Sequence, residues 1–138
     1  MITDYFRLEG KKALITGAGK GIGARIATAF AEMGADVALL ARTESDLDSV
    51  AREVTELGRE ALTFACDVTD ETALAGVVEN LTDHWGSLDI LVNNAGAPGQ
   101  GYGSLKKVTK ARFVNTLDIN LPSASPLTPL ALPLLQAA

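Results

Sequence analysis

The sequence contains only one cysteine, Cys66, so no disulfide can form within a single chain. A lone thiol is usual in a reducing compartment, and we therefore expect a cytoplasmic protein. No apolar run approaches the roughly 18 residues that a membrane-spanning helix needs. Residues 1–10 also lack the apolar core of a signal peptide. These absences argue against a membrane partner.

Basic residues are also scarce, with 12 Lys and Arg against 17 Asp and Glu and a net charge of −5. Because nucleic acids are bound by clustered basic side chains, and the chain has no basic run, we expect no nucleic-acid partner. Neither Cys66 nor the single histidine, His84, has a metal-ligand partner at a suitable spacing, so no metal site is expected. The 138 residues fit one globular domain.

Glycine, by contrast, is concentrated in residues 12–23, which read K-A-L-I-T-G-A-G-K-G-I-G. The apolar run at 13–15 is typical of a strand buried on both faces, and from Gly21 apolar residues recur about one helical turn apart. We therefore predict a strand, a glycine turn and a helix. Unpaired N–H groups at the start of such a helix attract a pyrophosphate, and glycine permits its close approach. The alternative is a tight turn that binds nothing.

The spacing of these glycines distinguishes between nucleotide-binding motifs. G-x-G-x-x-G does not fit from Gly17, because residue 22 is Ile, and a G-x-G-x-x-A match from Gly19 begins two residues late. The Walker motif fails because Lys20 is not followed by Ser or Thr. Residues 16–23 instead fit T-G-x-x-x-G-I-G.

Short apolar runs alternate with helical patterns along the chain. The runs at 13–15, 37–40, 62–66 and 90–92 are too short for helices, and amphipathic stretches of helical period separate them. Such alternation predicts an α/β fold, a three-layer Rossmann-type parallel sheet with right-handed crossovers and helices on both faces.

Several segments together resemble the short-chain dehydrogenase/reductase family of classical type. They are T-G-A-G-K-G-I-G at 16–23, A-R at 41–42, C-D-V-T-D at 66–70, W-G-S-L-D-I-L-V-N-N-A-G at 85–96 and R-F-V-N-T-L-D-I-N-L at 112–121. The resemblance implies strand order 3-2-1-4, a nicotinamide cofactor, and oxidoreductase chemistry on a carbonyl or alcohol substrate. It covers the chain to about residue 121, and we expect a single incomplete domain over 1–138 whose residues 122–138 form a divergent, proline-rich tail.

The resemblance also implies the cofactor site. The glycine turn would hold the pyrophosphate, Asp67 and Val68 would contact the adenine, Asn93 would stabilise the turn after the fourth strand, and the small residues that follow would lie along the cofactor. The predicted cofactor-binding residues are Gly17, Gly19, Lys20, Gly21, Ile22, Gly23, Arg42, Asp67, Val68, Asn94, Ala95 and Gly96.

The residues after the second strand bear on the choice between NAD and NADP. NAD-binding members of such folds usually place a carboxylate there for the ribose hydroxyls, whereas this chain has Ala41-Arg42 and no carboxylate before Glu44. A guanidinium can bind a 2′-phosphate through two hydrogen bonds, and Lys20 would add a second positive charge. We therefore predict NADP over NAD, with two solvated surface cations as the alternative.

The family's catalytic groups are an Asn, a Ser, a Tyr and a Lys, the last two in Y-x-x-x-K. By resemblance only Asn120, in I-N-L, matches this set. Tyr102 and Lys106 also spell Y-x-x-x-K, with Ser104 between them, but glycines at 99, 101 and 103 disfavour the helix that the motif requires. We therefore expect a loop there, and a 138-residue chain that binds NADP(H) without turning over a substrate.

Two expectations concern the end of the chain. Pro126 and Pro129 make a helix through residues 122–138 doubtful, which suggests either a fragment or a diverged terminus. Without further strands, residues 90–92 would be an exposed sheet edge, so we expect a homo-oligomer or a tail folded over that edge. The sequence leaves two functions open: the cofactor half of an NADP-dependent oxidoreductase, or a non-catalytic nucleotide-binding or assembly module.

Overall fold

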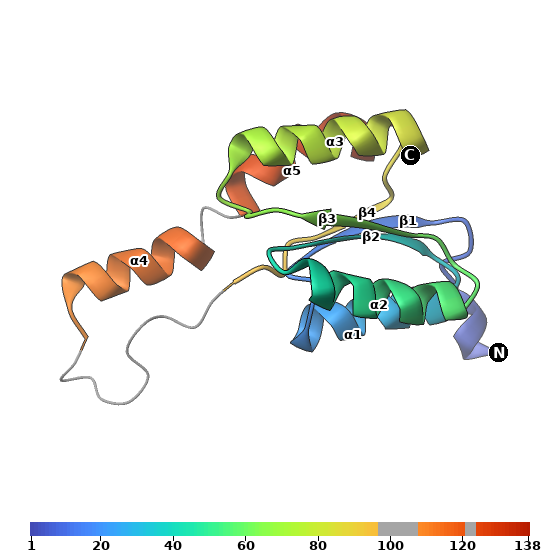
Figure 1. Ribbon diagram of the computed structural model, residues 1–138. Coiled ribbons are helices and arrows are strands. Elements are labelled where there is room, and N and C mark those ends of the chain that lie inside the picture. Colours follow the sequence, from blue (N-terminus) through green and yellow to red (C-terminus); the bar gives the residue numbers. More distant parts are fainter. Residues whose placement is uncertain (97–107, 121–123) are drawn as a thin grey trace.

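The computed structural model describes residues 1–96, 108–120 and 124–138, which form a parallel sheet of order β3-β2-β1-β4 covered by helices (Figure 1). The strands are β1 (Lys12–Thr16), β2 (Asp36–Ala41), β3 (Ala61–Ala65) and β4 (Ile90–Val92). The helices are η1 (Ile2–Phe6), α1 (Gly21–Glu32), α2 (Glu44–Glu56), α3 (Glu71–Trp85), α4 (Lys110–Asn120) and α5 (Ala124–Gln136). The predicted fold class and strand order are confirmed.

The helices lie in two layers, with α1 and α2 on one face of the sheet and α3 and α5 on the other (Figure 1). Successive side chains of β1 pack against helices on opposite faces of the sheet, because side chains alternate along a strand. Ala13 and Ile15 pack with α1 and α2, whereas Leu14 packs with α3 and α5. All three are fully buried, as the short continuous apolar run predicts.

The parallel register brings the carboxyl ends of the strands to one edge of the sheet. Thr16, at the end of β1, is level with Leu40 of β2, and Val92 of β4 is level with Ile15. In open α/β sheets this edge is where ligands bind. The predicted site residues follow β1, β2, β3 and β4, so the topology gathers them there.

Glu60 stabilises the opposite edge, where the start of β3 meets the end of α3. Its carboxylate accepts a hydrogen bond of 2.8 Å from Trp85 Nε1 and contacts His84 Nε2. The hydrogen bond from Trp85 and then the contact with His84 lower the pKa of Glu60. The ionised carboxylate therefore contributes to holding α3 against the sheet.

Helix α5 forms although Pro126 and Pro129 make a helix in this region doubtful from the sequence. Pro126 lies in its first turn, where the backbone N–H groups have no acceptor within a helix, so it removes no hydrogen bond. Leu127, Ala131 and Leu134 are buried against α3 and the sheet. The packing of this apolar side therefore stabilises a helix that its composition disfavours.

Strand β4 is an edge strand of the described sheet, and α5 is bound to residues on both sides of it. The carbonyl of Leu134 accepts a hydrogen bond of 3.0 Å from the N–H of Leu88, and Asn93 Nδ2 donates to Thr128 Oγ1 at 3.1 Å. The tail thus packs on the α3 face of the sheet and is bonded to the residues that flank β4. A tail folded over the edge itself stays a prediction, and so does the alternative, a homo-oligomer.

Helix α4 lies away from the sheet, beyond the carboxyl ends of the strands (Figure 1). Its apolar residues Phe113, Val114 and Leu117 are exposed. None of the helices in the described parts of the chain has the length and apolar character needed to cross a membrane.

Candidate functional site

The glycine turn follows β1 directly and passes into α1 at Gly21. Gly17 and Gly21 have φ angles of 63° and 60°, in the left-handed region that glycine tolerates best. Gly23 serves a different purpose, because a Cβ atom there would overlap the carbonyl oxygen of Gly17 and lie 2.6 Å from Asn94 Nδ2. The first turn of α1 is thereby held close to the end of β1.

Thr16 links the glycine turn to the segment that follows β4. Its buried hydroxyl accepts hydrogen bonds from the N–H groups of Asn94 (3.0 Å) and Ala95 (2.9 Å). The side chain of Asn94 donates in return to the carbonyls of Thr16 (3.2 Å) and Gly17 (3.3 Å). Asn94 therefore holds the segment after β4 against the glycine turn, whereas Asn93, predicted to stabilise the turn after the fourth strand, donates to Thr128 of α5.

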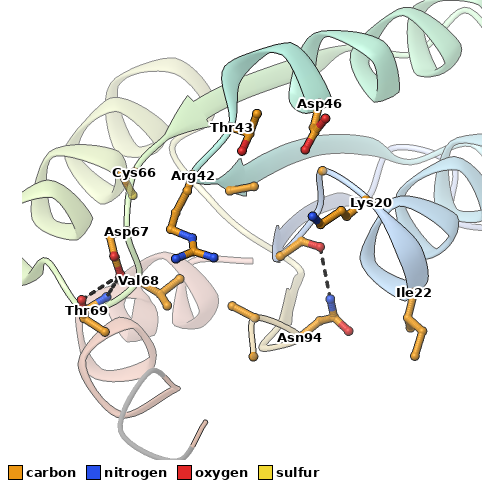
Figure 2. A pocket seen from close by; sticks show the side chains of 15 residues that line it. Lys20, Ile22, Arg42, Thr43, Asp46, Cys66, Asp67, Val68, Thr69 and Asn94 are labelled. Carbon is orange, nitrogen blue, oxygen red and sulfur yellow. Dashed lines mark hydrogen bonds between the residues drawn. The ribbon is translucent and has the colours of Figure 1, made fainter. Parts of the chain in front are cut away.

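A cleft of about 510 Å³ opens at this edge of the sheet (Figure 2). Every predicted cofactor-binding residue lines it except Gly21 and Gly23, which shape the turn behind it. The cleft is lined by Gly17, Gly19, Lys20, Ile22, Ala41, Arg42, Thr43, Asp46, Cys66, Asp67, Val68, Thr69, Asn94, Ala95 and Gly96. Segments following all four strands thus form one continuous surface.

The start of α1 is open and uncapped. A Cβ atom built on Gly21 would meet no atom within 4 Å, so there is open space beside the first residue of the helix. The N-cap residue of α1, Lys20, forms no side-chain capping bond to the first N–H groups of the helix. These donors are the groups that bind anions at helix starts.

Two cations line the cleft without a neutralising partner. Neither Arg42 nor Lys20 has a hydrogen bond or an ion pair through its side chain to any other residue in the described part of the chain. Both side chains are exposed, and Figure 2 shows the guanidinium of Arg42 reaching across the cleft toward Val68. An anionic ligand could therefore meet both of them.

Asp67 is already engaged by its own loop. Its Oδ1 accepts hydrogen bonds from the N–H (2.9 Å) and the hydroxyl (2.7 Å) of Thr69 (Figure 2). The backbone hydrogen bond, followed by the hydroxyl bond and more weakly the charge of Arg42, lowers the pKa of Asp67. The loop after β3 thus presents an ionised carboxylate at the rim of the cleft.

Five lining residues were not among the predicted cofactor-binding residues: Ala41, Thr43, Asp46, Cys66 and Thr69. Thr43 precedes α2 and forms no side-chain capping bond. Cys66 is half-buried, and burial raises the pKa of its thiol. The sequence offered one signal for these residues: each lies within four positions of Arg42 or Asp67, which were predicted to bind the cofactor.

Asn120, the predicted catalytic residue, lies at the end of α4 beside Gly96. A Cβ atom on Gly96 would collide with Asn120 Oδ1, while Asn120 Nδ2 donates to the carbonyl of Thr116 at 2.8 Å. The structure thus brings Asn120 next to the cleft, although it does not line it. Tyr102, Ser104 and Lys106 lie outside the described residues.

The family model described as short chain dehydrogenase matches residues 11–138. An uncharacterized oxidoreductase of Mycobacterium tuberculosis is 41% identical over 135 residues, which are 98% of this chain and 51% of the relative. The chain spans about half the length of the curated relatives it matches.

Two solved structures illustrate the likeness in space. L-sorbose reductase from Gluconobacter frateurii, complexed with NADPH and L-sorbose, has a TM-score of 0.83 and 33% identity, covering 95% of this chain and 49% of its own. Carveol dehydrogenase from Mycobacterium avium, in complex with NAD, has a TM-score of 0.84 and 31% identity, covering 94% and 50%. Both nicotinamide cofactors therefore occur among similar structures.

Proposed function

Because this chain belongs to the short-chain dehydrogenase family, we propose that it is the cofactor-binding part of an NADP(H)-dependent oxidoreductase acting on a carbonyl or alcohol. The observation that supports this best is the pair of cations, Arg42 and Lys20, that line the cleft at the carboxyl edge of the sheet and have no hydrogen bond or ion pair with another described residue. The bound cofactor would supply or accept the hydride, and the residues of this chain would bind and orient it.

The glycine turn and the start of α1 would hold the pyrophosphate. Unpaired N–H groups at a helix start carry partial positive charge, and the open space beside Gly21 leaves them accessible. The hydrogen bonds that Asn94 donates to Thr16 fix the turn before any ligand binds. Preorganisation of this kind lowers the entropy that binding would otherwise lose.

Arg42 and Lys20 would select the 2′-phosphate of NADP(H). A guanidinium offers two parallel N–H donors to a phosphate, and the ammonium of Lys20 adds a point charge from the glycine turn. Similar structures bind NAD in one case and NADPH in another, so the family alone does not decide the cofactor. The charge of these two residues is the reason to favour NADP.

The remaining predicted residues would place the two ends of the cofactor. Asp67 would accept a hydrogen bond from the exocyclic amine of adenine, while Val68 packs on the ring. At the other end, Asn94, Ala95 and Gly96 would lie along the nicotinamide half, next to Asn120. We infer that Asn120 orients groups near the reacting atoms.

Cofactor titration of the Arg42→Ala variant tests this function. A hydrogen bond to a charged group contributes about 1.5–3 kcal/mol, so the variant should bind NADPH roughly tenfold to a hundredfold more weakly. Its affinity for NADH should change little. Arg52→Ala is a matched control, because Arg52 is an exposed arginine of α2 that does not line the cleft. Equal affinities of the wild type for NADH and NADPH would contradict the proposal.

A second candidate is a nucleotide-binding or assembly module without catalysis. It is favoured by the glycines that flank Tyr102, which oppose the helical geometry that a Tyr-Lys pair needs. We expect the 138-residue chain to bind NADPH without reducing ketones or oxidising alcohols. Turnover on a panel of such substrates that disappears in Tyr102→Phe would overturn this expectation.

A further inference from the structure

The first turn of α2 directs one acidic side chain, Asp46, into the cofactor cleft. Asp46 is half-buried and lines the cleft, whereas Glu44, two residues earlier, is exposed and does not. A Cβ atom on Gly19 would lie 3.0 Å from Asp46 Cβ and 3.8 Å from Asp46 Oδ2. The Asp46 side chain therefore packs against the glycine turn at Gly19, the residue before Lys20.

The charge of Asp46 is not neutralised by its surroundings. Among the described residues its carboxylate has no hydrogen bond and no ion pair, whereas Asp67, the other acidic residue of the cleft, is bonded twice to Thr69. Figure 2 shows Asp46 and Lys20 on facing sides of the opening, with Arg42 further along it. The cleft thus presents two cations and two carboxylates, and the free carboxylate lies among the groups proposed to bind phosphate.

We propose that Asp46 is a specificity-determining residue that limits the preference for NADP(H). This inference rests on the proposed function, because it concerns the same 2′-phosphate. A 2′-phosphate carries close to two negative charges, which an unpaired carboxylate in the same cleft repels. The 2′-hydroxyl of NAD(H) carries none and can donate a hydrogen bond to an acceptor. The charge of Asp46 therefore opposes the charges of Arg42 and Lys20, and it reduces the difference in affinity between NADP(H) and NAD(H).

Asp46→Asn tests this role, because it removes the charge and keeps the shape and an acceptor oxygen. We expect NADPH and the fragment 2′,5′-ADP to bind about tenfold more tightly, which corresponds to about 1.4 kcal/mol. NADH and 5′-AMP should change by less than about twofold. The gain should shrink as salt is raised, since partly exposed charges are screened.

Glu44→Gln is the matched control, with the same charge change in the same helical turn but outside the cleft. An equal gain from Glu44→Gln would mean that general charge, and not the placement of Asp46, sets the affinity, and would overturn the proposal. Weaker NADH binding by Asp46→Asn with unchanged NADPH binding would overturn it too, since Asp46 would then serve the ribose hydroxyls.

The outcome separates the two hypotheses. If the wild type binds NADPH and Asp46→Asn binds it with the same affinity, the role of Asp46 is refuted and the proposed function stands. If Arg42→Ala binds NADPH as tightly as the wild type does, the proposed phosphate site is refuted. Protein that binds neither dinucleotide refutes both.

Discussion

Replacing Gly23 with alanine should reveal how tightly the glycine turn is packed. Gly23 is buried in the first turn of α1, against the end of β1. A Cβ atom at this position would overlap the carbonyl oxygen of Gly17 and approach its carbonyl carbon to 2.8 Å and Asn94 Nδ2 to 2.6 Å. Real Cβ atoms do not make such contacts with backbone, so the helix or the turn has to move.

The size of the effect follows from the groups that must move. Overpacking of a buried position typically costs about 1–3 kcal/mol. Displacing Asn94 would also weaken its hydrogen bonds to Thr16 and Gly17, each contributing about 1 kcal/mol. Alanine returns at most about 1 kcal/mol through its higher helix propensity. We expect Gly23→Ala to lower the free energy of unfolding by a net 2–4 kcal/mol, or about a third of a typical domain's stability.

The matched control is Gly76→Ala, in the middle of α3. Gly76 is exposed, and a Cβ atom there would meet nothing within 4 Å, so alanine should stabilise the protein by up to about 1 kcal/mol. Urea unfolding followed by the fluorescence of Trp85, the single tryptophan, would measure both variants. Stabilities of Gly23→Ala and Gly76→Ala that agree within 0.5 kcal/mol, a typical surface effect, would refute the packing argument.

Two further predictions concern titrating groups. Burial raises the pKa of the Cys66 thiol, so alkylation by N-ethylmaleimide should be slow at neutral pH, accelerate as the pH rises, and be suppressed by saturating NADPH; an unchanged rate with NADPH would place the cofactor elsewhere. Because the pKa of Glu60 is lowered in the folded state, its ionised carboxylate stabilises the fold at pH values above the ordinary pKa of a glutamate. This stabilisation is lost as the pH falls through the lower, folded-state pKa. Trp85→Phe should therefore destabilise the protein more at pH 7 than at pH 3 in urea titrations, and an equal loss at both would rule out the carboxylate–indole hydrogen bond as its source.

The fold could be predicted because its two central strands, β1 and β2, are buried on both faces. The runs at 13–15 and 37–40 are apolar without alternation, as strands between two helical layers must be, and each lies within an observed strand. The run at 90–92 coincides with β4. The glycine at 86 adopts a φ of 71° at the end of α3, as glycine after a helix commonly does.

The site could be predicted only in part, since the sequence reveals residues that follow strands more readily than residues on the first turn of a helix. Arg42 and Asp67 come directly after the second and third strands, so topology alone places them at the cleft. Asp46 reads in the sequence as an ordinary acidic residue near a helix start, where the dipole favours negative charge. Its direction toward Gly19 depends on how α2 packs against the sheet, which no local pattern contains.

Helix α5 shows why the position of a proline matters more than its presence. An interior proline costs a helix about 3 kcal/mol, and α5 carries Pro129 and Pro133 in its interior. These two prolines lie one turn apart and are both exposed, so water can bond the backbone groups that they leave unpaired. The opposite side buries Leu127 and Leu134, and burying a leucine contributes about 1.5–3 kcal/mol. The free energy gained by burying these leucines is of the same size as the free energy lost at the two prolines. Helix propensity includes the loss at the prolines but not the gain from burial.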